Sequence, residues 1–194
     1  QGNLGAARCA YATPEGVAFR FEVTSDHWRG SGSVLPSDLA RCVGLHEGQS
    51  LTLSSAIGEQ TIYWTGIQPS LGSVKRLVED LEAEPGSWVM ATFGTEGDFR
   101  LRRLELSGQS GVALAQTMTG TDSLPAADAR AGIAEALSLP ADSGWPSIIA
   151  AAGDRGEDDL ASALLRDPDV GASNDTGDRP PGRGESSVTS DDIL

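Results

Sequence analysis

The feature that most constrains the fold is a stretch that occurs twice. Residues 29–53 read as a glycine-containing turn, a short helix, a tight loop and a strand, and residues 71–93 follow the same order. Two interpretations stay open: an internal repeat that builds one pseudo-symmetric domain, or two unrelated units that share turn chemistry. The matching positions are Gly32-Ser33-Val34 with Gly72-Ser73-Val74, and Leu39, Val43 and Gly48 with Leu77, Leu81 and Gly86.

Strand and helix signals surround both copies. Residues 17–23 alternate apolar and polar side chains, with Arg20 and Glu22 on the polar face, which predicts a half-buried strand. Pro36 suits the first turn of a helix, and Gly44 suits its end. Further strands are expected at residues 50–55, 60–64, 88–93 and 99–104.

The character of the chain changes after residue 106. Residues 107–111 are rich in glycine and serine and predict a boundary, and three short helices are expected at residues 133–137, 146–152 and 157–165. We therefore predict a mainly β fold, a small pseudo-symmetric β-barrel with two short helices. The expected parts are a linker or peripheral strand (1–16), a two-repeat β-barrel (17–106), a helical appendage (112–167) and a disordered acidic tail (168–194).

Composition limits the classes of function. The chain of 194 residues has a net charge of −14, with 9 Lys/Arg against 13 Asp/Glu in residues 1–110 and 5 against 15 in residues 111–194. This acidity argues against general polyanion binding, although the first half is nearly balanced. No apolar run reaches the about 18 residues of a membrane span, so no membrane partner is expected. Cys9 and Cys42 show no metal-ligand spacing, and two free thiols fit a cytoplasmic location.

The first copy resembles the AbrB/MazE type of swapped-hairpin DNA-binding fold. The resemblance rests on glycines 30 and 32, the Leu35-Pro36 helix start, the Val43-Gly44-Leu45 helix end and Gly48 before a strand, and covers roughly residues 28–55. A degraded version covers residues 68–93. Two tandem copies imply a barrel closed within one chain, as in double-psi barrels and DNA-binding pseudobarrels. The resemblance implies this fold more directly than it implies DNA binding.

Basic and aromatic residues supply the candidate binding site. Arginines 100 and 102 project to one face of the last predicted strand, and the tryptophans offer rings for stacking on bases. The alternative is that these cations pair with nearby carboxylates on an ordinary surface. The candidate nucleic-acid-binding residues are Trp28, Arg29, Lys75, Arg76, Arg100, Arg102 and Arg103.

No catalytic constellation is visible in the sequence. His27 and His46 are the only histidines, and both are expected to be solvated loop residues without a partner for general-base catalysis. The glycine-rich residues 30–33 lack the Gly-Lys-Ser/Thr ending of a phosphate-binding loop, and the carboxylates in residues 154–169 lack the spacing of a calcium loop. We expect neither an enzyme nor a cofactor or metal site.

Two functions remain as hypotheses. The first is a non-catalytic nucleic-acid-binding (DNA or RNA) or regulatory module. Because the sequence begins with Gln1, we expect it to be the C-terminal part of a larger DNA- or RNA-processing or regulatory protein. The second is a protein-interaction or scaffolding module that contacts a protein partner through residues 153–194.

Overall fold

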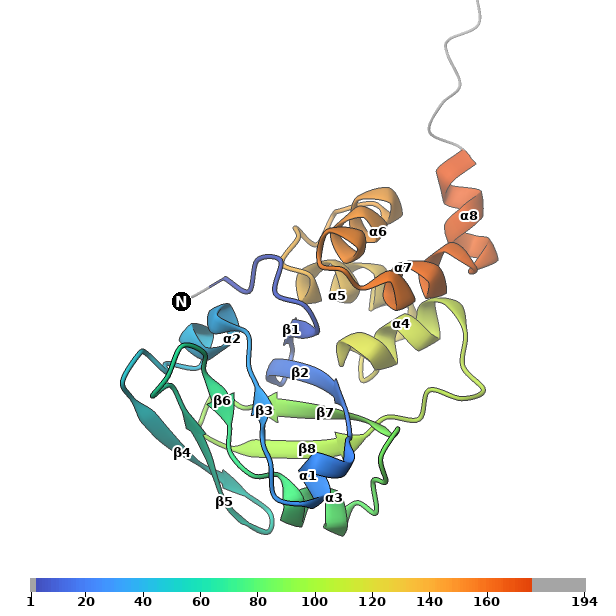
Figure 1. The fold of residues 1–194 in the computed structure, drawn as a ribbon. Coiled ribbons are helices and arrows are strands. Elements are labelled where there is room, and N and C mark those ends of the chain that lie inside the picture. The colour runs from blue at the N-terminus through green and yellow to red at the C-terminus, as the bar shows by residue number, and fades with distance from the viewer. Residues whose placement is uncertain (1–2, 176–194) are drawn as a thin grey trace, which may run out of the picture.

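Two β-sheets and a group of helices make up the computed structural model, which describes residues 3–175 (Figure 1). The sheets occupy one half of the molecule, and the helices after residue 110 form the other half. The elements of the sheet half are β1 (Ala10–Thr13), β2 (Gly16–Glu22), α1 (Ser25–Trp28), β3 (Ser33–Val34), α2 (Ser37–Cys42), β4 (Ser50–Ser55), β5 (Gly58–Tyr63), β6 (Ser70–Leu71), α3 (Lys75–Asp80), β7 (Trp88–Phe93) and β8 (Phe99–Arg103).

The strands form two open antiparallel sheets. Sheet A has the order β1-β2-β7-β8, and sheet B has the order β3-β6-β5-β4. A single parallel bridge between Ser54 and Asp98 connects β4 to β8. The prediction of a closed barrel is therefore wrong for the described residues. Residues 1–16, for which a linker or a peripheral strand is expected, contain the edge strand β1, which pairs with β2 from Ala10 opposite Phe19 to Thr13 opposite Gly16.

The two sequence copies have equivalent backbone hydrogen bonds. The Gly48 N–H donates to the Trp64 carbonyl at 2.6 Å, and the Gly86 N–H donates to the Val23 carbonyl at 2.9 Å. The pairing of β2 with β7 thus corresponds to the pairing of β5 with β4, and β3 pairs with β6. At the start of each copy, the structure makes β3 equivalent to β6. The predicted match of Gly32 with Gly72 is therefore out of register with the strands. The later helix and strand match as the sequence predicts.

Apolar residues lie on both faces of sheet A. One face joins sheet B in a core that contains Phe19, Phe21, Ile62 and Phe99. The other face meets the C-terminal helices in a second core that contains Met90. Because helices cover the outer face of sheet A, the fold is mixed α and β rather than mainly β.

The C-terminal half contains more helix than the sequence predicts. The three expected helices are present as α5, α6 and α7; α5 and α6 are longer than expected, and α7 is one residue shorter. The helices α4 and α8 are additional: Ser110, the N-cap of α4, makes no side-chain capping bond, and Asp167 accepts the Asp169 N–H at the start of α8. The expected disordered tail begins too early, because residues 168–175 form α8, while residues 176–194 lie outside the described residues. The elements are α4 (Gly111–Thr119), η1 (Ala126–Asp128), α5 (Ala129–Ala136), α6 (Trp145–Asp154), α7 (Asp158–Leu165) and α8 (Pro168–Asp175).

Among the helices of residues 3–175, none combines the length and the apolar composition that crossing a membrane requires.

Candidate functional site

The predicted basic strand β8 carries cations that are all paired. Arg102 forms a two-pronged contact with Asp122, at 3.1 Å and 2.7 Å. Arg100 lies 3.4 Å from Glu15, and Arg103 lies 4.0 Å from Glu105. Arginines 100 and 102 share one face, as predicted, but each has an acidic partner from another segment.

The cations of α1 and α3 also have partners. Arg29 pairs with Asp26 at 2.9 Å. Lys75 lies 3.9 Å from Glu79 one helical turn on. Arg76 donates to the backbone carbonyls of the β4–β5 turn, the nearer at 3.1 Å. Each of these contacts matches the ordinary-surface alternative for the candidate residues.

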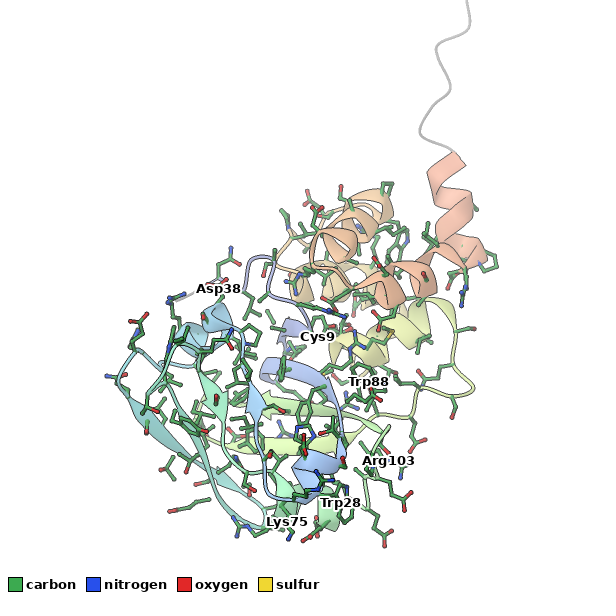
Figure 2. The ribbon with its side chains drawn as sticks, viewed as in Figure 1. Cys9, Trp28, Asp38, Lys75, Trp88 and Arg103 are labelled. Carbon is green, nitrogen blue, oxygen red and sulfur yellow. The ribbon has the colours of Figure 1, made fainter. Side chains whose placement is uncertain are left out.

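Trp28 and Arg103 do come together, but in acidic surroundings. The Trp28 indole N–H donates to the Ala83 carbonyl at 2.9 Å, which fixes the ring. Both residues line a hollow of about 1070 Å³ together with Glu79, Glu82 and Glu84. Figure 2 shows Trp28, Lys75 and Arg103 at the end of the molecule away from Cys9. Three carboxylates in this hollow oppose the binding of a phosphate beside Trp28 and Arg103.

A break in the pseudo-symmetry creates a different site. In the second copy, β6 pairs with β5 at Ile62–Leu71 and Tyr63–Ser70. In the first copy, the equivalent strand β3 pairs with β6 alone and leaves β2. Residues 24–32 with α1 form the longer connection between β2 and β3. The gap between β2 and β3 is a cleft of about 440 Å³, which we call the β2–β3 cleft.

The β2–β3 cleft is mostly apolar and has a free cation. Phe19, Phe21 and Leu35 supply buried apolar side chains, and Val34 at its edge is 55% exposed. Among the described residues, Arg8 and Arg166 are the arginines whose side chains have no hydrogen bond or ion pair. The full lining is Arg8, Cys9, Phe19, Arg20, Phe21, Glu22, Val34, Leu35, Pro36, Ser37, Gln68 and Trp88.

The edge of β2 beside this cleft is free of a neighbouring strand. β1 covers β2 only as far as Phe19, and the last contact is the Arg20 N–H donating to the Cys9 carbonyl at 2.9 Å. Cys9 has a φ of 61°, a left-handed conformation that turns the chain away from β2. Beyond this hydrogen bond, the backbone from the Arg20 carbonyl to Glu22 is paired on its β7 side only.

A buried charge network lies behind the cleft and joins β2 to the helices. The Arg20 side chain is 1% exposed; it donates to Asp159 at 2.9 Å, to Glu157 at 3.3 Å and to the Tyr11 hydroxyl at 3.2 Å. The Tyr11 hydroxyl donates to Glu157. Arg155 donates to the carbonyls of residues 5 and 7 at 2.8 and 2.9 Å, which holds the N-terminal segment in place. The network therefore fixes the wall from which Cys9 and Arg20 face the cleft.

Burial shifts the pKa values of several groups near the cleft. Burial raises the pKa of the Cys9 thiol, so the thiol is protonated and a weak nucleophile at neutral pH. Burial also raises the pKa of Tyr11. For Asp159, burial favours the neutral acid, but the hydrogen bond and charge of Arg20 outweigh it and lower the pKa. Asp159 is therefore ionised in its pair with Arg20.

The two histidines have different environments. The expectation of a solvated loop is wrong for His27, which lies buried in α1 and accepts the Thr24 N–H at 2.9 Å through Nδ1. Its Nε2 lies 2.8 Å from the Ser33 hydroxyl. His46 is exposed, as predicted. Residues 3–175 contain no group of three or more His, Cys, Asp or Glu residues placed to hold a metal ion.

Sequence reasoning missed the β2–β3 cleft, since no local pattern shows which strands fail to pair. The comparisons with known proteins add no family, because no family model and no curated protein matches this chain.

Proposed function

We propose that the chain is a non-catalytic protein-interaction module that binds an extended segment of a partner protein in the β2–β3 cleft. The observation that carries the proposal is the missing strand pair: β6 lies on β5, whereas β3 leaves the equivalent edge of β2 open. An open strand edge beside apolar pockets is the arrangement used when a peptide adds to a sheet.

The chemistry of the lining defines the partner segment. The rings of Phe19 and Phe21 favour an apolar side chain, and burial of such a side chain contributes about 1.5–3 kcal/mol. The free guanidinium of Arg8 favours an acidic residue nearby. The backbone from Arg20 to Glu22 offers hydrogen bonds to the segment's own backbone. The volume of the cleft is in the range of small ligand sites, so we expect a short segment rather than a folded surface.

Nucleic-acid binding has less support as a function of this chain. Each cation of its candidate set already has a carboxylate or carbonyl partner, and the Trp28 ring is held beside glutamates. The hypothesis that the acidic C-terminal helices hold a partner stays a prediction. Its main element α7 is engaged with Arg20 inside the molecule.

A selection for peptide ligands tests the proposal. A random peptide library displayed on phage is selected on the intact chain, and the enriched peptide is labelled with fluorescein and titrated. Gln68→Trp fills the cleft from an exposed loop position and is expected to weaken binding at least about tenfold, or about 1.4 kcal/mol. Thr65→Trp, in the same loop and outside the cleft lining, is the matched control and is expected to bind like the wild type.

The two cysteines report where the peptide binds. Cys9 lines the cleft and Cys42 lines a separate hollow, so the peptide should slow alkylation of Cys9 only. Arg8→Glu is expected to weaken an acidic peptide, whereas Arg166→Glu, at the other unpaired arginine, is not. Selected peptides that bind Gln68→Trp as tightly as the wild type and leave Cys9 unprotected contradict the proposal.

A further inference from the structure

Exposed large apolar side chains gather at one end of sheet B. Four such residues occur in the described part of the chain: Val34, Tyr63, Ile67 and Leu165. The register places Val34 opposite Ser70 and Ser70 opposite Tyr63, so these three side chains form a row on one face of the sheet. Ile67, in the loop between β5 and β6, is 96% exposed. Three of the four therefore lie together.

The rest of this face is almost uncharged. The row continues from Tyr63 to its register partner Ser50, and the next rows pair Thr61 with Thr52 and Glu59 with Ser54. The side chains alternating with these point into the core between the sheets. Glu59 is the only charged side chain among the eight outward positions, in a chain of which 22% is charged. We call these eight positions and Ile67 the outer face of sheet B.

Charge decides which partner fits this face. A charged partner would need charges of opposite sign on this face, and Glu59 is the only charge among its outward positions. Interface cores are depleted of charged residues, as this face is, and tyrosine, present here as Tyr63, is among the residues enriched in them. A partner that presents a similarly uncharged sheet face fits this surface, and a second copy of the chain carries one. Two copies with a net charge of −14 each repel least where their surfaces are uncharged.

We propose that the outer face of sheet B is a self-association surface, on which two copies pack sheet against sheet about a two-fold axis. Aligned packing of two such faces brings the Tyr63 rows and the Ile67 loops of both copies into contact. The proposal does not depend on the peptide-binding function, since the β2–β3 cleft shares only Val34 with this face.

Sedimentation of the full chain tests this directly. At concentrations from about 1 to 200 μM and moderate salt, we expect a reversible monomer–dimer equilibrium. Ile67→Lys and, separately, Thr61→Lys place a charge in the face at exposed positions, and each should raise the dissociation constant at least about tenfold. Leu165→Lys, at the exposed apolar residue outside the face, should leave the dissociation constant unchanged.

The effect of added salt distinguishes a dimer held by this uncharged face from a dimer held by ion pairs. Salt screens the repulsion between two acidic copies, so the dimer should be strengthened or unchanged between about 0.05 and 0.5 M NaCl. A chain that stays monomeric up to about 200 μM overturns the proposal. A dimer that ignores both lysine variants, or that weakens with salt, also overturns it, because another surface then holds the copies together.

Discussion

Arg20 Nη1 lies 2.9 Å from the Asp159 carboxylate and ties a central strand of sheet A to the first turn of α7. The same guanidinium contacts Glu157 and the Tyr11 hydroxyl and lies over the Trp88 ring, 4.9 Å from its centroid. One side chain thereby joins sheet A to α7, and its strand also forms the edge of the proposed binding cleft.

Arg20→Ala is expected to destabilise the chain strongly. The change leaves the fully buried Glu157 without its main cationic partner, and removing one partner of a buried ion pair costs about 3–5 kcal/mol. Chemical denaturation followed by circular dichroism measures the loss. Arg29→Ala removes an exposed pair with Asp26 and should cost under about 1 kcal/mol. Equal losses in the two variants would show that the network adds no stability.

His27 makes stability depend on pH between about 7 and 5. Burial lowers the pKa of His27, against opposing effects of Asp26 and the Gly32 backbone. Because the folded-state pKa lies below the ordinary value of about 6.5, the unfolded chain binds more protons in this range. The stability from neutral His27 is therefore fully present above about pH 6.5 and is lost as the pH falls through the lower folded-state value.

Denaturation midpoints between about pH 8 and 5 measure this dependence. Acidification should lower the midpoint of the wild type, and His27→Gln, although less stable at neutral pH, should show a flatter profile. His46→Gln changes the exposed histidine and should keep the wild-type slope. A slope that persists in His27→Gln and disappears in His46→Gln would contradict the assignment.

The sequence predicts elements better than it predicts their partners. The alternation of residues 17–23 correctly places Phe19 and Phe21 in the core, and the expected bounds of β4 and β7 are met. The same alternation assigns Arg20 to a solvated face, yet Arg20 is buried because the C-terminal helices cover that side of the sheet. A period of two separates the faces of a strand but cannot reveal what covers each face.

The candidate site shows the same limit. The positions of the six cations and Trp28 follow from their strands and helices, but some of their partners, Glu15 for Arg100 and Asp122 for Arg102, come from distant segments. The β2–β3 cleft exists because β3 pairs with β6 and not with β2, and a strand of two residues has almost no sequence signal. Non-local pairing decides both outcomes.

The ion pairs also predict how the chain behaves toward nucleic acid. Labelled double-stranded DNA and single-stranded RNA at about 50 mM salt should show no saturable binding, since the candidate cations are neutralised within the chain. Fluorescence anisotropy is the measurement. Binding that weakens with salt, and that is lost on charge reversal at Arg100, Arg102 and Arg103, would restore the nucleic-acid hypothesis.

The contact between β3 and β6 requires glycine at position 32. A Cβ atom on Gly32 would lie 1.8 Å from the Leu71 carbonyl oxygen, a backbone atom that cannot move without separating the two strands. Gly32→Ala should therefore cost about 3 kcal/mol in unfolding free energy. Gly66→Ala is the control, because its Cβ would meet nothing within 4 Å. If the two variants denature alike, the close approach of residue 32 to the Leu71 carbonyl is not needed for the fold; if only Gly32→Ala is destabilised, the fold depends on that approach.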